Sequence, residues 1–162
     1  MREIALCYFS RLAEDIGQVE IREIVAKASR KNAIAGITGC LVVDGGFFAQ
    51  VLEGPDDVVR AIVDRIAQDS RHHDMRIVWL DTISERAFQT WAMSGIDLAH
   101  APDPHASSIR GLREDLHQFL EMTPDGSQRQ FPEFFQHCLA CLRDKILPEE
   151  IVIEAPSYLR AG

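Results

Sequence analysis

Two strand patterns joined by a glycine turn, with an amphipathic helix pattern on either side, constrain the fold of this chain more than any other feature. The strands are residues 37–43 (ITGCLVV) and 47–53 (FFAQVLE). Residues 44–46 (DGG) favour a hairpin, because glycine readily adopts the positive φ that such turns need. Apolar residues recur at helical spacing over residues 18–32 and again after residue 54, which predicts a helix on each side of the hairpin.

Three further strand patterns complete the order of elements. Apolar and alternating residues predict strands at residues 2–9, 75–80 and about 91–98. The resulting order is β-α-β-β-α-β-β, in which both helices cross between strands and therefore cover the same face of the sheet. The sequence thus predicts an α+β protein with a ferredoxin-like sheet and two helices on one face.

The C-terminal part offers a cover for the opposite face of the sheet. Two helical stripes follow a linker with two prolines at residues 101–104. We therefore divide the chain into a sheet domain at residues 1–98, a helical pair at residues 99–147 and a tail at residues 148–162 with little periodicity. The stripes consist of Ile109, Leu112, Leu116, Phe119 and Leu120, and of Phe131, Phe134, Phe135, Cys138 and Leu142.

The charge balance narrows the classes of partner. The 162 residues include 17 Lys and Arg against 25 Asp and Glu, a formal net charge of −8. A surface of this sign repels phosphate backbones and anionic lipids, so we expect neither nucleic acid nor membrane as a partner. No apolar run approaches the ~20 residues of a membrane span, and the N-terminal residues MREIALCYFS do not resemble a signal peptide. We expect a cytoplasmic protein.

The four cysteines are more consistent with packing than with chemistry. Cys7 and Cys40 lie in apolar strand patterns, where a thiol behaves as a small hydrophobic group. Cys138 and Cys141 form one Cys-x-x-Cys pair inside a helical pattern, whereas a redox motif normally opens a helix. One pair does not complete a zinc site, so we expect no metal. We favour core packing, with redox chemistry as the alternative.

Two polar residues do not fit the apolar faces on which they lie. Gln50 shares one strand face with Phe48 and Leu52, and a buried amide costs about 1–3 kcal/mol unless it is hydrogen-bonded. Tyr8 raises the same question on the first strand, beside Leu6. Each residue alone is compatible with a purely structural role.

Together with their surroundings, these residues resemble the BLUF family of blue-light sensors that use flavin. The resemblance covers about residues 2–98, and its spacings match throughout, whereas a lone GITG or LEG would be a weak signal. Its motifs are Tyr8, Asn32, Gly36-Ile37-Thr38-Gly39, Phe48-x-Gln50-x-Leu52-Glu53-Gly54, Asp69-x-Arg71-His72 and Phe88-x-x-Trp91-x-Met93. The family's ferredoxin-like fold agrees with the order of elements read from periodicity.

The resemblance implies a flavin, FAD or FMN, inserted between the two helices against the sheet. Asn32 would hydrogen-bond the polar edge of the isoalloxazine ring, and Gln50 would lie between that ring and Tyr8. Arg65 and Asp69, expected on the second helix, resemble positions that contact the pyrimidine end of the ring.

The same resemblance extends to other parts of the pocket. Trp91 and Met93, expected on the fifth strand, match residues whose placement responds to light. Arg71 and His72 fall in a less uniform part of the family pattern. Lys31 and Ala28 depart from the family, which often has asparagine and serine there, and these changes concern the fine tuning of the pocket.

The implied function is that of a blue-light photoreceptor and not an enzyme. Light would drive electron and proton transfer from Tyr8, and Gln50 would rearrange its hydrogen bonds, since an amide both donates and accepts. The signal would pass to a separate protein or change a homo-oligomer. Two other classes stay open: a small ferredoxin-like hydrolase similar to acylphosphatases, and a flavin-free interaction module. The hydrolase needs an anion-binding loop after the first strand, where residues 10–14 offer a single arginine.

Overall fold

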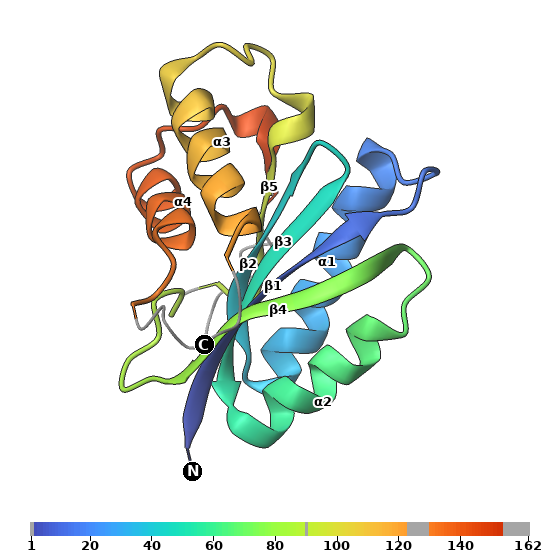
Figure 1. Ribbon diagram of the computed structural model, residues 1–162, viewed down its shortest axis with the longest axis vertical. Helices are drawn as coiled ribbons and strands as arrows, with labels where there is room; N and C mark the ends of the chain where they lie inside the picture. Colours follow the sequence, from blue (N-terminus) through green and yellow to red (C-terminus); the bar gives the residue numbers. More distant parts are fainter. Residues whose placement is uncertain (1, 90, 123–129, 154–162) are drawn as a thin grey trace.

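A six-stranded mixed sheet forms the middle layer of the structure (Figure 1). The computed structural model describes residues 2–89, 91–122 and 130–153. Its strands and helices are β1 (Glu3–Leu12), α1 (Gln18–Ala35), β2 (Thr38–Asp44), β3 (Phe47–Pro55), α2 (Asp56–Ala67), β4 (His72–Thr82), β5 (Ser94–Asp97), α3 (Ser107–Leu120), α4 (Glu133–Arg143) and β6 (Val152–Ile153), with short 3₁₀ turns at Leu98–His100 and Glu149–Ile151. The strand order β4-β1-β3-β2-β5-β6 places the predicted hairpin at the centre of the sheet.

Glycine geometry fixes the ends of the central elements. Gly45 and Gly46 have φ of 54° and 84°, values that suit glycine and close the β2–β3 turn. Helix α1 runs three residues beyond the expected end at residue 32, because the left-handed residue Gly36 terminates it. The Gly36 N–H donates to the carbonyl oxygen of Asn32, so Asn32 lies inside the last turns of the helix.

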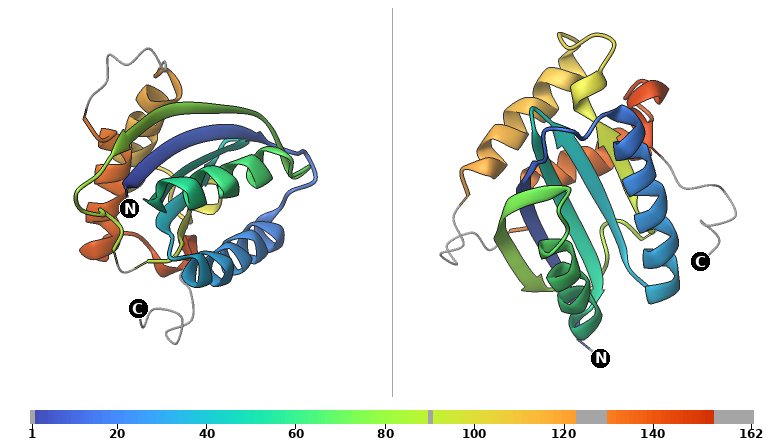
Figure 2. Two further views of the ribbon diagram at one scale, coloured as in Figure 1. Left: turned by 90° about the horizontal axis from the view of Figure 1, so that it is seen from below. Right: turned by 90° about the vertical axis from the view of Figure 1, so that its right-hand side faces the viewer.

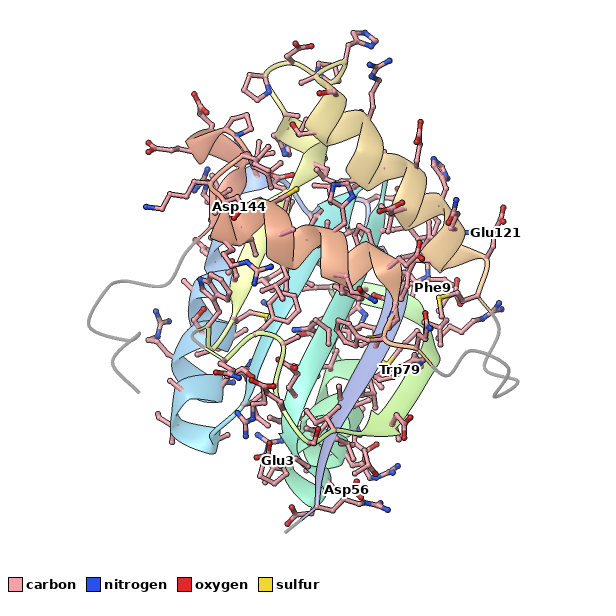
Figure 3. The ribbon with its side chains drawn as sticks, turned by 90° about the vertical axis from the view of Figure 1, so that its left-hand side faces the viewer. Glu3, Phe9, Asp56, Trp79, Glu121 and Asp144 are labelled. Atoms are coloured by element: carbon pink, nitrogen blue, oxygen red, sulfur yellow. The ribbon has the colours of Figure 1, made fainter. Side chains whose placement is uncertain are left out.

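The two faces of the sheet are covered by different helices, as the sequence predicts. Figure 2 shows α1 and α2 on one face and α3 and α4 on the other, and Figure 3 views the face covered by α3 and α4. Alternation along β1 divides the core in two: Leu6 and Tyr8 pack towards α1 and α2, and Ala5 and Cys7 pack towards α3 and α4. The architecture is therefore the expected ferredoxin-like α+β sheet with an additional helical layer.

The fifth strand is shorter than expected. We predicted a strand over about residues 91–98, but β5 begins at Ser94, where its parallel pairing with Cys40 of β2 starts. Before that point a turn brings the Trp91 N–H to the carbonyl oxygen of Phe88, 3.2 Å away. Trp91 and Met93 therefore precede the strand instead of lying on it.

The expected C-terminal tail also contains structure. Residues 149–151 form a 3₁₀ turn, and β6 pairs antiparallel with β5, so this part of the 148–162 prediction is wrong. Gly95 explains the docking, because a Cβ at this position would lie 3.1 Å from the Cβ of Ile153 and 2.8 Å from Val25. The missing side chain leaves room for Ile153 beside α1. Residues 154–162 lie outside the described part of the chain.

All four cysteines are buried and free. Cys138 and Cys141 lie within α4, as predicted, and Cys138 contacts Cys40 of β2 across the helix–sheet interface. Burial raises the pKa of the Cys138 thiol well above its ordinary value, which disfavours the reactive thiolate. These observations favour the packing interpretation.

No helix within the described ranges combines the length and the apolar character that crossing a bilayer requires.

Candidate flavin-binding site

Tyr8 and Gln50, the polar residues that interrupt the apolar strand patterns of the sequence, lie on the part of the sheet between α1 and α2. Helix α1 packs on β2, β5 and β6, whereas α2 packs on β1 and β3, so the two helices rest on different strands. Tyr8 on β1 and Gln50 on β3 are direct partners in the antiparallel register. Both side chains are buried, at 3% and 4% exposure. Strand pairing therefore brings a phenol and an amide together although they are far apart in the chain.

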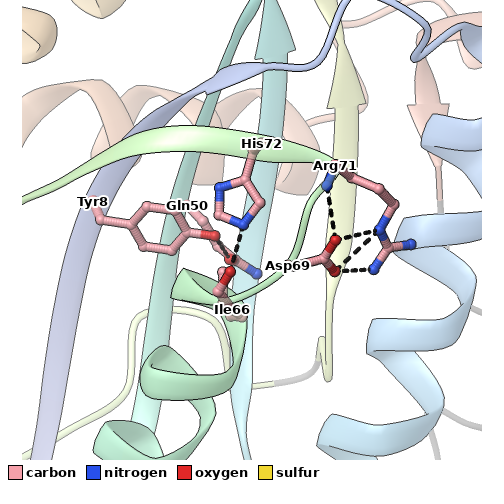
Figure 4. Close-up of polar contacts among 6 residues, drawn as sticks. All are labelled: Tyr8, Gln50, Ile66, Asp69, Arg71 and His72. Carbon is pink, nitrogen blue, oxygen red and sulfur yellow. Dashed lines mark hydrogen bonds and ion pairs between the residues drawn. The ribbon is translucent and has the colours of Figure 1, made fainter.

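Tyr8 and Gln50 are joined by a hydrogen bond. The Tyr8 hydroxyl donates to Gln50 Oε1 (Figure 4). On its other side, Gln50 Nε2 lies 3.5 Å from the Sδ of Met93. A thioether is a weak acceptor, so the Gln50 amide keeps most of its donor capacity for a better partner.

The environment keeps Tyr8 protonated. Burial raises the pKa of the Tyr8 hydroxyl above its ordinary value, and the negative charge of Asp69 adds to the effect. Near neutral pH the phenol therefore holds its proton and points it at Gln50.

Asn32 and Ser29 connect α1 to the chain that enters β5. Asn32 is 5% exposed, and its Nδ2 donates to the carbonyl oxygen of Ala92 at 3.2 Å. Ser29, one turn earlier, donates from Oγ to the carbonyl oxygen of Met93 at 2.8 Å. Within the described residues the Asn32 Oδ1 accepts no hydrogen bond, so it is available to a ligand.

The loop after α2 is held by an ion pair. We expected Asp69 on the second helix, but α2 ends at Ala67 and Asp69 follows it. The Arg71 side chain forms a forked pair with the Asp69 carboxylate, with Nε 2.9 Å and 3.0 Å from its two oxygens. This hydrogen bonding lowers the pKa of Asp69 to about 2. Asp69 therefore stays ionised near Tyr8.

Arg65 is exposed and lies away from the Tyr8–Gln50 pair, whereas His72 is buried. Arg65 is exposed on α2, and the structure does not bring its side chain to the Tyr8–Gln50 pair. His72 is buried, and its Nε2 lies 2.6 Å from the carbonyl oxygen of Ile66 (Figure 4). Its Nδ1 is buried without a hydrogen-bond partner among the described residues.

Trp91 and Met93 lie on opposite faces of the sheet. Met93 is buried in the apolar cluster that contains Tyr8. Trp91 is half-buried against the other cluster, and its ring meets the edge of Phe88 at a centroid distance of 6.3 Å. In this structure it is therefore methionine, not tryptophan, that contacts Gln50.

A groove of about 830 Å³ opens on the Trp91 side of the sheet, between α4 and the connection from β4 to β5. Its lining includes Trp79, Trp91, Phe131 and Glu53. This groove does not include Tyr8 or Gln50. It leaves part of Trp91 accessible to solvent.

Sequence reasoning missed two polar residues, Ser29 and Glu53. Glu53 was part of a motif but received no role, although a carboxylate that continues the alternation of Ala49 and Val51 is a signal in itself. Its side chain is 1% exposed and accepts hydrogen bonds from the connection between β4 and β5. Ser29 left no such signal, because a serine within a helix is common.

The free hydrogen-bonding functions at this strip fit a flavin. The pyrimidine end of the isoalloxazine carries carbonyl oxygens and an N–H, which require donors and acceptors at fixed positions. Gln50 Nε2 offers a donor, Asn32 Oδ1 an acceptor, and His72 Nδ1 a buried atom that has no partner in the part of the chain that the structure describes. Half-buried Ile24 and Ile66, from the two helices, supply apolar surface for the ring. The described residues contain no cluster of three or more His, Cys, Asp or Glu side chains that could hold a metal.

The hydrolase alternative lacks its anion-binding loop. Residues 10–12 continue β1, and the Ser10 side chain is fully buried. The Arg11 guanidinium lies 4.9 Å from the centre of the Phe47 ring. The single arginine of this region is thus on a strand and not in a loop that could cradle a phosphate.

The structure is a ferredoxin-like sheet that buries a hydrogen-bonded tyrosine and glutamine on the face covered by α1 and α2, beside donors and acceptors that fit a flavin. The profile of the BLUF family, described as sensors of blue-light using FAD, matches residues 4–94. The chain belongs to the BLUF family, whose members bind a flavin and act as sensory modules.

Individual relatives agree with this assignment. The chain is 36% identical over 90 residues to the beta subunit of photoactivated adenylate cyclase from Euglena gracilis, covering 55% of this chain and 10% of the relative. It is 36% identical over 93 residues to the blue light- and temperature-regulated antirepressor BluF of Escherichia coli strain K12, covering 57% of this chain and 23% of the relative. The dark-state structure of BlrB, a BLUF protein, superposes with a TM-score of 0.67 at 25% identity, covering 89% of this chain and 97% of that one.

The chain thus spans less than a quarter of the length of these two curated relatives.

Proposed function

We propose that this protein is a blue-light photoreceptor in which Tyr8 is the electron and proton donor and Gln50 is the hydrogen-bond switch. The observation that carries the proposal is the buried hydrogen bond from the Tyr8 hydroxyl to Gln50 Oε1. A bound flavin supplies absorption of blue light and, once excited, a strong oxidant.

Tyr8 and Gln50 have complementary tasks. With a flavin bound, Tyr8 would supply an electron, and its phenol, then strongly acidic, would release its proton along the hydrogen bond to Gln50 Oε1. Gln50 would accept this proton at Oε1 and release one from Nε2, so that one proton and one electron would leave the phenol together. Their return to Tyr8 would restore its hydroxyl and leave the Gln50 amide with a different set of hydrogen bonds, which an amide allows because it both donates and accepts.

Asn32 would orient the flavin rather than react. Its Nδ2 is engaged by the Ala92 carbonyl, which fixes the amide plane and directs Oδ1 as an acceptor for a ring N–H. Asp69 would act near the same end of the ring, together with Arg65 if that exposed side chain folds back.

We further propose that the change at Gln50 reaches a separate protein through the C-terminal helices. Gln50 contacts Met93, which precedes β5, and β5 leads into α3. Arg113 of α3 binds the Asp44 carboxylate at 3.0 Å and the carbonyl oxygen of Leu98 at 2.9 Å. A sensor domain at residues 1–98 and a coupled helical pair at residues 99–147 would therefore communicate without catalysis by this chain, through a partner or a homo-oligomer.

Absorption spectroscopy tests the photochemical part of the proposal. The purified protein should be yellow, and blue light should shift its flavin absorption slightly to longer wavelength, with reversal in darkness. Tyr8→Phe keeps the volume of the ring but removes the hydroxyl, and Gln50→Leu removes both hydrogen-bonding functions. Both variants should bind flavin and lose the normal red shift.

Tyr158→Phe serves as the control for the substitution chemistry, because it removes the hydroxyl of the other of the two tyrosines in the sequence. It should retain the complete photocycle. A normal red shift in Tyr8→Phe would refute the proposed role of Tyr8, and a colourless wild type would refute flavin binding itself.

A further inference from the structure

Glu53 is a buried carboxylate on the strand that carries Gln50. Along β3, Phe48 and Leu52 belong to the core under α1 and α2, and Ala49 and Val51 to the core under α3 and α4. Gln50 therefore faces the proposed flavin site, whereas Glu53 faces the opposite side of the sheet. A carboxylate at 1% exposure must be compensated by hydrogen bonds.

Those hydrogen bonds come from the connection between β4 and β5. The N–H of Ala87 donates to Glu53 Oε2 at 2.5 Å, and the N–H of Phe88 donates to Oε1 at 2.8 Å. Thr38 adds its hydroxyl to Oε1 at 3.2 Å. Both carboxylate oxygens thus hold consecutive backbone N–H groups, a two-point attachment that fixes orientation as well as position.

The attachment positions Trp91. Phe88 is fully buried, and the Trp91 N–H returns to the Phe88 carbonyl oxygen at 3.2 Å. The carbonyl oxygen of Trp91 accepts from the Gly39 N–H at 3.0 Å. Gly39 itself permits no Cβ, which would lie 2.0 Å from the carbonyl oxygen of Val51. The location of Trp91 is therefore set by Phe88 on one side and by β2 on the other.

The same strand also holds the other end of this connection. Gln50 Nε2 lies 3.5 Å from Met93 Sδ, on the flavin side of β3. Glu53 holds Ala87 and Phe88 from the opposite side. We call residues 87–89 and 91–93 the connecting segment. Strand β3 contacts both of its ends, α1 also holds the carbonyl oxygens of Ala92 and Met93, and only the Met93 end involves a residue of the proposed photoreaction.

We propose that Glu53 is a positioning residue of the photosensor, which holds the Phe88 end of the connecting segment in place while Gln50 changes its contact with Met93. The proposal rests on the photoreceptor function proposed above. Because Glu53 fixes the Phe88 end, a rearrangement at Gln50 displaces Trp91 and Met93 relative to β2. Without the fixed end, the whole connecting segment adjusts, and the light-induced arrangement relaxes faster.

Glu53→Gln is the informative substitution, because glutamine has the same shape but a single acceptor oxygen. Its NH₂ group would face a backbone N–H, so one of the two attachments is lost. We expect normal flavin content, a normal red shift, and recovery in darkness faster by about fivefold or more, the rate effect that the loss of one hydrogen bond corresponds to. Thr38→Val removes only the Thr38 hydroxyl. It should also make dark recovery faster, by a smaller factor than Glu53→Gln does.

Glu3→Gln is the matched control. Glu3 binds Arg86, the residue directly before the connecting segment, with distances of 3.0 Å and 2.7 Å. The substitution removes the same charge and a neighbouring tether but leaves the Glu53 attachment intact. We expect recovery within about twofold of the wild type.

A second measurement distinguishes positioning from general stabilisation. In a Trp79→Phe background Trp91 is the one remaining tryptophan, since the sequence has two. Acrylamide quenching of its fluorescence should differ between light and dark in that background, and Glu53→Gln should remove the difference.

The possible outcomes separate this inference from the function on which it rests. A wild type without a light-induced red shift would refute the photoreceptor function. A wild type with a red shift, together with Glu53→Gln whose recovery is unchanged or slower, would overturn the role of Glu53 alone. A lowered melting temperature in Glu53→Gln with unchanged recovery and unchanged quenching would likewise overturn it, since that result describes a residue that only stabilises the fold.

Discussion

Two fully buried serines allow the attachment of Met93 to α1 to be measured. Ser29 and Ser10 are both 0% exposed. Ser29 donates to the carbonyl oxygen of Met93 at 2.8 Å, whereas the Ser10 hydroxyl has no partner among the described residues. Replacing either serine by alanine removes one oxygen from a closed environment. The difference between the two variants therefore reports the hydrogen bond to Met93 together with the different preference of alanine for helix α1 and strand β1.

The expected magnitudes follow from the two environments. An intramolecular hydrogen bond contributes about 0.5–1.5 kcal/mol net, so Ser29→Ala should lower the free energy of unfolding by about 1 kcal/mol. For a chain of this size that corresponds to a decrease of about 2–4 °C in Tm. Ser10→Ala removes a buried hydroxyl that forms no hydrogen bond with the described residues, and such a change is neutral or stabilising.

Urea denaturation of flavin-loaded protein, followed by far-ultraviolet circular dichroism, measures both variants on one scale. The free energy of unfolding must fall with urea concentration at the same slope in both variants, because a changed slope would indicate a changed denatured state. The reasoning fails if the free energy of unfolding of Ser29→Ala is equal to or greater than that of Ser10→Ala.

Two further predictions concern the C-terminal helix and the dependence of stability on pH. Replacing Cys138 and Cys141 together by alanine should lower Tm, because side-chain volume is lost from the core. The photocycle should be unaltered in both reducing and oxidising buffer. A dark-recovery rate that depends on redox conditions in the wild type but not in the variant would contradict the packing interpretation. Asp69 has its pKa lowered from 3.8 to about 2 by Arg71, so its contribution to stability is complete above pH 3.8 and is lost as the pH falls towards 2. Asp69→Asn should therefore flatten the acid side of the stability curve, and an unchanged acid transition in this variant would show that the ion pair does not stabilise the fold.

Much of the fold follows from patterns that are local in the chain. Alternation along β1 places Leu6 and Tyr8 on one face because successive side chains of a strand point to opposite sides. The turn at Gly45 and Gly46 follows from the conformational freedom of glycine. The apolar stripe of α4 predicted a cover for the second face of the sheet, which the structure confirms.

The errors occur where pairing between distant segments decides the structure. The alternation of Trp91 and Met93 looked like a continuation of β5, but pairing with β2 begins at Ser94. Residues 152–153 are too few to show a strand pattern, and they form β6 because Gly95 leaves space beside β5. Strand ends and short edge strands depend on what lies next to them, which periodicity does not contain.

For the site, the sequence by itself determined that Tyr8 shares a strand face with Leu6 and that Gln50 shares one with Phe48 and Leu52, because side chains alternate along a strand. That both faces lie under the first two helices was implied by the resemblance to the BLUF family and not by periodicity. Only the tertiary structure decided that Tyr8 and Gln50 are direct neighbours, since that depends on the register of β1 against β3. It also decided that Met93 and not Trp91 contacts Gln50, and that Glu53 holds Ala87 and Phe88. Hydrogen bonds between residues that are distant in the chain depend on how separate strands and helices pack, and a single sequence records only the spacing of residues along one chain.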